Sequence, residues 1–262
     1  MVVKYVLLLG NKEVPEMKLT HSLAAVALSL TAFAAQAEVT GNAAVVSDYN
    51  WRGITQTSQD PALQAGIDYA HESGFYLGAW GSNVDFGDCC DENVEIDVYT
   101  GFRGGDAITW DVGLIYYAYP GADDIDYPEI YLGLGWNWLS GKVYYSNDFG
   151  NSGESAFYYE ANAAYDLPSN FGVSAHLGYS DGDAIDLFYD DGYMDWSVGV
   201  TYDWSHFTFG LKYADGSDLD ILDHWRLNSK PALIIGMDVL GSLDTLVIDY
   251  RYNELRVKTR RP

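Results

Sequence analysis

The chain has 262 residues, of which 48% are hydrophobic and 15% aromatic, enough apolar material for a folded domain. Its formal net charge at pH 7 is −24, from 38 acidic residues against 14 lysines and arginines. Because nucleic acid and anionic lipid headgroups would be repelled by this charge, the composition argues against both as partners.

The first 37 residues are set apart from the predicted fold. Residues 1–16 precede a second methionine, Met17, and we interpret them as an over-extended gene start. From Met17 the chain reads MKLTHSLAAVALSLTAFAAQA, which predicts a signal peptide over residues 17–37 with a small-x-small cleavage site. Its apolar run is shorter than the roughly 18 residues that a membrane-spanning helix needs. We therefore expect a mature chain that starts at Glu38 and lies outside the cytoplasm, either soluble or spanning a membrane as strands.

Eleven segments that follow Glu38 alternate apolar and polar side chains, a pattern typical of β-strands. Short turns and longer acidic loops alternate between the segments, which is the organisation of an outer-membrane β-barrel. In LGLGWNWLSGKVYYSNDF (132–149), we predict a hairpin whose two-residue turn is Ser140 and Gly141. The predicted strands are 38–52, 63–71, 75–86, 94–104, 108–119, 129–139, 142–149, 156–167, 171–181, 194–204 and 207–215.

The two faces of these strands differ in chemistry. One face is apolar with aromatic residues near the strand ends, as contact with lipid requires. A soluble barrel would show the same alternation with its apolar face inside. Because eleven or twelve strands exceed the roughly eight whose side chains fill a barrel, we expect a water-filled lumen instead. The polar face then supplies the candidate pore-lining residues, which are Glu95, Asp97, Arg103, Asp111, Glu160, Asp166, Asp203 and Lys212.

The charge pattern changes near Asp223. Residues 38–223 contain 32 acidic and 4 basic residues, whereas residues 224–262 contain 4 acidic and 7 basic residues. We therefore predict the barrel over 38–223 and an atypical C-terminal segment over 224–262. Two interpretations of this segment stay open: a final strand at 245–252, which would give twelve strands and the usual even number, or a frameshifted tail.

The sequence offers little catalytic chemistry. His71 lies near Ser73 and His176 near Ser174, but neither pair belongs to a nucleophile motif. The acidic stretch 181–195 departs from the spacing of a calcium-binding loop, so we interpret it as a solvated loop. The adjacent Cys89 and Cys90 are assigned no role. We predict no enzyme activity, no cofactor and no metal site.

The stretch SDYNWRGITQT (47–57), together with EIDVYTGFRG and YPEIYLGLGW, resembles the TorF porin family. The resemblance covers residues 17–220, and its most specific block contains Ser47, Asp48, Tyr49, Trp51, Arg52 and Gly53. It implies an all-β, transmembrane, antiparallel up-and-down barrel in the outer membrane of a Gram-negative bacterium. Such a barrel would contact outer-membrane lipid and be inserted by the barrel assembly machinery. The family brings no catalytic residues to this chain.

Three functions remain open from the sequence. A porin would let small hydrophilic solutes diffuse through the lumen, and its acidic lining would favour cations by repelling anions. A non-conducting structural or adhesion barrel would need a plugged lumen. An outer-membrane enzyme would need a convergent polar site at one end of the barrel.

Overall fold

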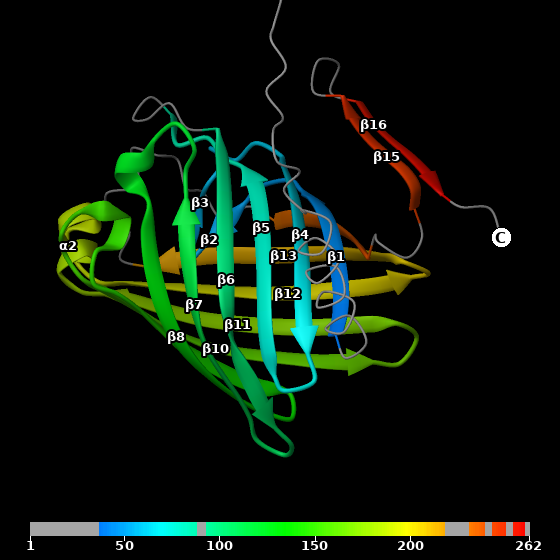
Figure 1. Cartoon of the computed structure of the whole chain (residues 1–262), viewed down its shortest axis with the longest axis horizontal. Coiled ribbons are helices and arrows are strands. Elements are labelled where there is room, and N and C mark those ends of the chain that lie inside the picture. Colours follow the sequence, from blue (N-terminus) through cyan, green and yellow to red (C-terminus); the bar gives the residue numbers. More distant parts are fainter. Residues whose placement is uncertain (1–36, 88–92, 218–230, 239–242, 250–253, 260–262) are drawn as a thin grey trace, which may run out of the picture. The chain divides into compact units, whose positions relative to one another are not determined.

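The described part of the chain forms a closed antiparallel barrel of twelve strands, shown in Figure 1. The structure is a computed structural model and describes residues 37–87, 93–217, 231–238, 243–249 and 254–259. Around the barrel the strands follow the order β1-β14-β13-β12-β11-β10-β9-β8-β7-β6-β5-β4. The predicted all-β, up-and-down barrel of twelve strands is thereby confirmed. The barrel strands are β1 (Ala37–Val46), β4 (Ala62–His71), β5 (Phe75–Asn83), β6 (Val94–Gly105), β7 (Thr109–Ala118), β8 (Tyr127–Trp136), β9 (Leu139–Ser146), β10 (Ala156–Leu167), β11 (Phe171–Asp181), β12 (Tyr193–Trp204), β13 (Phe207–Ser217) and β14 (Pro231–Asp238).

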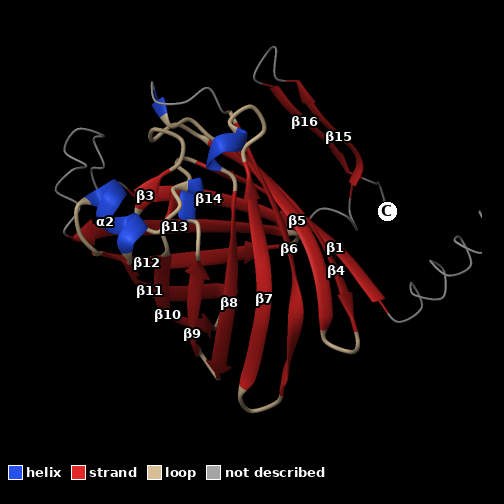
Figure 2. Ribbon diagram, turned by 60° about the vertical axis from the view of Figure 1, so that its left-hand side comes forward, coloured by secondary structure: helices blue, strands red, loops and turns tan. Residues whose placement is uncertain are grey.

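Long and short connections lie at opposite ends of the barrel. Figure 2 shows the helical segments among the long loops at one end, which we call the loop end, and short turns at the other, the turn end. The helical segments are α2 (Asp183–Tyr189) and the 3-10 helices Asp123–Ile125 and Phe149–Asn151. The acidic stretch 181–195 thus contains a helix rather than only an irregular loop.

The turn between β8 and β9 differs from the predicted one. Trp136 pairs with Leu139, so the two turn residues are Asn137 and Trp138 rather than Ser140 and Gly141. Asn137 has a φ of 53°, a left-handed conformation that asparagine tolerates better than most residues. The Ser-Gly pair instead lies within β9, where Ser140 pairs with Gly135.

The outer surface of the barrel is apolar. Large hydrophobic side chains point away from the lumen along the middle of the strands and are about half exposed, among them Val98, Val112, Leu132, Val198 and Leu211. No helix in the described residues has the length and hydropathy needed to cross a membrane. A closed barrel with an apolar outside exposes no unpaired backbone edge to lipid, which is the condition for spanning a membrane with strands.

Two strands differ from the sequence prediction. The predicted strand 38–52 ends at Val46, because the chain then leaves the sheet. The predicted closing strand at 245–252 is wrong: residues 243–249 form β15 (Leu243–Asp249), which pairs with β16 (Glu254–Thr259) in a separate two-stranded sheet. The barrel closes instead through β14, which pairs with β13 and β1. Its sequence, PALIIGMD, begins with proline and has adjacent apolar residues, so it carries no alternation signal.

Several predictions fall on parts of the chain outside the described residues. These are the gene start at 1–16, the signal peptide up to residue 36, Cys89 and Cys90, and residues 224–230. They stay predictions.

The lumen is packed at the loop end. A cluster of buried side chains joins the ends of β7, β8 and β12 to the loops, and includes Tyr117, Tyr127, Phe149, Ile185 and Tyr193. The rings of Tyr127 and Phe149 lie 4.9 Å apart, centroid to centroid. The expectation of a water-filled lumen is therefore wrong at this end, because the loops fold inward and fill the space that twelve strands leave open.

Candidate functional site

The chain folds into the lumen directly after β1. Asn50–Trp51 (β2) pair with Ile54–Thr55 (β3) in a short hairpin, which we call the lumen hairpin. Its turn residues, Arg52 and Gly53, have φ values of 48° and 81°, and two consecutive positive φ angles are the signature of the tight type I′ turn. A Cβ atom on Gly53 would lie 2.7 Å from the Cβ of Asp195, so the turn contacts β12 and only glycine fits there.

The residues around the lumen hairpin hold it in place. The Thr55 hydroxyl donates a hydrogen bond to Asp48 Oδ1 at 2.5 Å, and the backbone N–H of Gln56 donates to the carbonyl of Tyr49 at 2.6 Å. The Tyr49 hydroxyl donates to Glu95 Oε1 at 2.8 Å. Burial raises the pKa of the Tyr49 phenol, and the carboxylates of Glu95 and Asp97 raise it further, so it stays a donor. The block that resembles the TorF porins therefore forms one folded unit inside the barrel.

Arg52 makes the most enclosed ionic contact of this unit. Its Nη1 and Nη2 donate to Glu129 Oε1 and Oε2 at 2.8 and 2.6 Å, and the two side chains are 7% and 2% exposed. The guanidinium carbon lies 4.2 Å from the ring centroid of Trp51, 4.3 Å from that of Tyr158 and 5.0 Å from that of Tyr144. We call Glu129 and these three rings the Arg52 cage. Burial alone would lower the pKa of Arg52, but the Glu129 carboxylate raises it, and the net pKa lies above its usual value.

Besides Asp195 on β12, three carboxylates are buried at the same end of the lumen. Glu95 and Asp97 lie on β6 and Glu129 on β8, and all three are almost fully enclosed. The Tyr117 hydroxyl, on the strand between them, donates to Glu129 Oε2 at 3.1 Å. Among the buried side-chain atoms of the described residues, Asp97 Oδ1 is the one without a hydrogen-bond partner. Glu95 and Asp97, predicted to line a pore, therefore lie in the packed part of the lumen.

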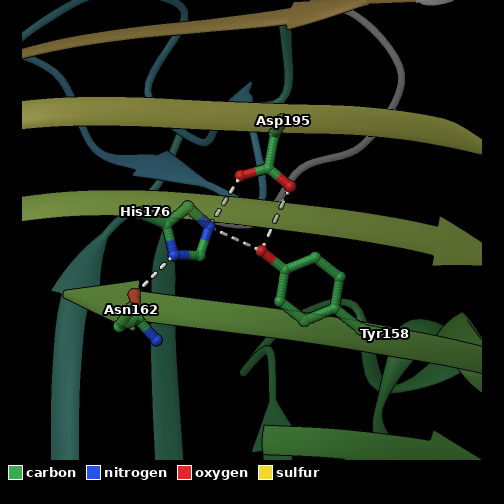
Figure 3. A network of polar contacts seen from close by, with 4 residues as sticks. All are labelled: Tyr158, Asn162, His176 and Asp195. Carbon is green, nitrogen blue, oxygen red and sulfur yellow. Dashed lines mark hydrogen bonds and ion pairs between the residues drawn. The ribbon is translucent and has the colours of Figure 1, made fainter. Parts of the chain in front are cut away.

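A cavity of about 470 Å³ lies beside the lumen hairpin. Figure 3 shows the polar network on its wall, in which the Tyr158 hydroxyl donates to Asp195 Oδ2 at 3.1 Å. His176 Nε2 lies 3.0 Å from both Asp195 Oδ1 and the Tyr158 hydroxyl, and its Nδ1 lies 2.7 Å from Asn162 Oδ1. The predicted pore-lining residues Glu160 and Lys212 line the same cavity.

The remaining predicted lining residues lie toward the turn end. Asp111 Oδ2 and Lys142 Nζ form an ion pair at 3.1 Å, and Arg103 lines a second cavity of about 450 Å³ beside them. Asp166 and Asp203 are exposed near the ends of β10 and β12, and Asp203 accepts a hydrogen bond from Thr208 at 2.6 Å. The eight predicted residues thus do not form one ring but lie at different depths.

Sequence reasoning missed the residues that complete the site. The sequence patterns do not single out Glu129, Tyr144 or Tyr158; Asp195 is considered only as part of the acidic stretch 181–195, and Arg52 only as part of a family block. One signal could have found Arg52: it is one of only four basic residues between Glu38 and Asp223. A lone arginine between tryptophan and glycine in so acidic a stretch needs a specific anionic partner.

The two histidine hypotheses have different outcomes. His71 Nδ1 lies 2.8 Å from Ser73 Oγ, but this pair is exposed in a short turn. His176 contacts Asn162, Asp195 and Tyr158, as described above, rather than Ser174. Within the described residues, no group of three or more histidine, cysteine or acidic side chains is arranged to hold a metal ion. That the protein is not an enzyme stays a prediction.

Comparison with known proteins identifies the family. Residues 31–225 match the family described as "Bacterial protein of unknown function (Gcw_chp)", which covers most of the chain. The chain belongs to the Gcw_chp family. No curated protein matches its sequence. The TorF name stays a resemblance of sequence.

Solved structures similar to the Gcw_chp chain are porins. The KdgM porin matches with a TM-score of 0.50 at 10% identity, over 76% of this chain and 98% of that one. The NanC porin matches with a TM-score of 0.50 at 11% identity, over the same shares. These likenesses show the fold, that of a porin barrel. With the apolar outer surface, they place the protein in the bacterial outer membrane, as predicted.

Proposed function

We propose that this protein is an outer-membrane porin that lets small hydrophilic solutes diffuse passively and prefers cations. The observation that carries the proposal is the charge inside a closed barrel. Three inward acidic residues are paired, Glu129 with Arg52, Asp111 with Lys142 and Asp195 with His176. Further carboxylates, including those of Glu160, Asp166 and Asp203, add negative charge without an ion pair among the described contacts. A lumen with this excess repels anions and attracts cations.

The solute path would run past the lumen hairpin. The cavity of about 470 Å³ beside the hairpin is within the range of about 300–1,000 Å³ typical of small-molecule sites. The hairpin and the buried loop-end cluster would form the constriction. Outer-membrane lipid and the barrel assembly machinery are the partners that this fold requires during and after insertion.

The proposed solutes differ from the one named for a structural neighbour. One KdgM structure is described as a complex with disordered oligogalacturonate, a polyanion. The acidic lumen of the Gcw_chp chain would repel such a solute. We therefore expect neutral and cationic solutes.

The test is single-channel conductance of the protein purified from the outer membrane of an expression host, in a planar bilayer under a KCl gradient. Stepwise openings with a reversal potential that favours K⁺ are expected. A reversal potential that favours Cl⁻ would contradict the cation preference, and silence from protein known to be folded and inserted would contradict the porin itself.

One observation favours a second function, a non-conducting structural barrel. The packed loop end, with Tyr193 and Ile185 at most 2% exposed, resembles a plug more than an open pore. The same recording separates the two functions, because a structural barrel stays silent at all voltages.

A further inference from the structure

We propose that a row of hydroxyl and amide side chains on the lumen wall binds neutral, polyhydroxylated solutes, and that short oligosaccharides are the solute class it takes. The proposal names a solute for the proposed porin and rests on that function only in that the solute must enter the lumen. We call this row the hydroxyl track. Its six positions are Thr109 on β7, Gly135 on β8, Ser140 on β9, Asn162 on β10, His176 on β11 and Ser197 on β12.

The hydroxyl track follows from the register of the sheet. Each of its positions pairs in register with the next, from Thr109 to Ser197. Because neighbouring strands lie about 4.8 Å apart, the positions are spaced at close to the length of one sugar ring. Thr109 and Ser140 lie at the turn end of their strands, whereas Asn162 and Ser197 lie near the middle of theirs. The track therefore climbs the wall from the turn end toward the lumen hairpin, as a row across tilted strands does.

Three adjoining cavities lie along the track. The last three positions line the cavity of about 470 Å³ beside the lumen hairpin, and the first three line the cavity of about 450 Å³. A third cavity, of about 430 Å³, is lined by the first four positions and so adjoins both others. Space for a solute therefore runs along the whole track, and the lumen hairpin stays in place when it is filled.

The polar groups of the track are accessible and unused. Thr109 and Ser140 are exposed, and Asn162 and Ser197 are half-buried. Within the part of the chain that the structure describes, the three hydroxyls make no hydrogen bond to the protein. Asn162 Oδ1 faces His176 Nδ1 at 2.7 Å, and Figure 3 shows the amide nitrogen on the far side of this contact. The hydrogen-bonding capacity of these groups is therefore left for a solute.

The wall holds the amide of Asn162 in a fixed orientation. His176 Nδ1 faces this amide, while its Nε2 lies 3.0 Å from both Asp195 Oδ1 and the Tyr158 hydroxyl. A group that is already oriented loses less conformational entropy when it binds a solute. The network in Figure 3 therefore positions Asn162 for binding.

The charges beside the track favour a solute without net charge. The next lumen-facing row toward the loop end is formed by Arg103, Asp111, Gly133, Lys142 and Glu160. Its two cations and two anions supply donors and acceptors in equal number. A hydroxyl group both donates and accepts, so a sugar matches both rows. An anion or a cation would meet like charges along the same path.

The solute class is tested by isothermal titration calorimetry of the purified protein, in a detergent without a sugar headgroup. The probes are three linear trisaccharides of similar size: neutral cellotriose, a cationic glucosamine trisaccharide and anionic trigalacturonate. Cellotriose should bind saturably, and both charged probes at least about tenfold more weakly, because each meets like charges beside the track. Tighter binding of either charged probe would overturn the neutral solute class.

The track itself is tested with Thr109→Val/Ser140→Ala/Ser197→Ala, which removes the three hydroxyls. Because these hydroxyls bond to no described group, the thermal unfolding midpoint should not change. Cellotriose binding should weaken at least about tenfold, from the loss of up to three hydrogen bonds. Unchanged binding would overturn the proposal.

Thr201→Val is the matched control. A Cβ on Gly172 would lie 2.5 Å from Thr201 Oγ1, as one on Gly135 would from Thr109 Oγ1. Thr201 is on the lumen side of β12 but lines none of the three cavities. This variant should bind cellotriose as the unaltered chain does, and an equal loss of binding would contradict the track.

Two further results separate the proposal from its setting. If the triple variant does not fold, Ser197→Ala alone replaces it, with binding about fivefold weaker; unchanged binding overturns the proposal. Saturable, track-dependent binding in a barrel that never conducts would overturn the porin but support the track. Conductance without cellotriose binding would do the reverse.

Discussion

Two ion pairs inside the barrel have similar chemistry but different environments. Arg52 and Glu129 are 7% and 2% exposed, whereas Lys142 and Asp111 are 31% and 26% exposed. Water can take the place of a lost partner only at the second pair. The position of a charge, more than its presence, therefore decides what its removal costs.

Glu129→Gln should be among the most destabilising substitutions in the lumen. It leaves the Arg52 guanidinium buried without an anion, which costs about 3–5 kcal/mol in comparable cases. The matched control is Asp111→Asn at the more exposed pair, with an expected cost below about 1 kcal/mol. The free energy of unfolding in denaturant measures both, and equal losses would contradict the assignment of a buried cage.

Tyr158→Phe should destabilise the network on the cavity wall. The hydroxyl is buried and donates to Asp195 Oδ2, so its removal leaves a buried carboxylate oxygen with one donor fewer, at a cost of about 1–3 kcal/mol. Tyr165→Phe, on the lipid face where Tyr165 is 58% exposed, should change stability by less than about 0.5 kcal/mol. The thermal unfolding midpoints of the two variants measure this difference. Equal midpoints would show that the network does not stabilise the fold.

At the scale of strands, the lumen wall is built from tyrosines that lie over glycines of the neighbouring strand. A Cβ on Gly113 would lie 2.5 Å from the Tyr131 hydroxyl oxygen and 2.7 Å from the carbonyl oxygen of Thr100. The same relation holds for Gly178 and Tyr158. Glycine in a strand usually weakens it, but here the ring of a neighbour covers the exposed backbone.

Gly113→Ala should therefore disturb β7 and its neighbours. The methyl group meets both a ring and backbone, so the ring must move, at a cost of about 1–3 kcal/mol. Gly141→Ala is the matched control on β9, where a Cβ would meet only the carbonyl of Glu160 at 3.1 Å. A thermal midpoint lowered more by the Gly141 variant than by the Gly113 variant would refute this packing.

The strands could be predicted from the sequence, but the elements that fill the lumen could not. Alternation over ten residues records which side chains face lipid, and β6, β10, β11 and β12 follow it within a residue or two. No local sequence pattern predicts where the lumen hairpin lies, because Glu129 and Asp195, which it contacts, belong to strands that are distant in the sequence. β14 was missed because its sequence does not alternate. The same reason explains why Arg52 was noted without its cage.

The stability of the whole barrel depends on apolar side chains facing lipid on its outside and polar side chains on its inside. Val112, near the middle of β7, is outward and about half exposed, whereas Ile108 lies in the short turn before that strand. The depth of a side chain in the bilayer should therefore set the effect of a charge placed there.

Val112→Lys should cost about 2–4 kcal/mol and Ile108→Lys about 0–1 kcal/mol, as expected for charges at the middle and the edge of the bilayer. Unfolding of the protein from lipid vesicles measures both values. Equal costs at the two positions, or none at Val112, would contradict a transmembrane orientation of β7.

The lumen hairpin also constrains the order in which the molecule is assembled. It lies near the start of the barrel, but Glu129 comes 77 residues after Arg52, and Asp195, which contacts Gly53, comes later still. Contacts of such high sequence separation form only after the intervening chain has been ordered. The family block is therefore synthesised early but reaches its final position late. It can make these contacts only after the strands from β8 to β12 have formed. Folding kinetics followed at the hairpin should lag behind the formation of the sheet.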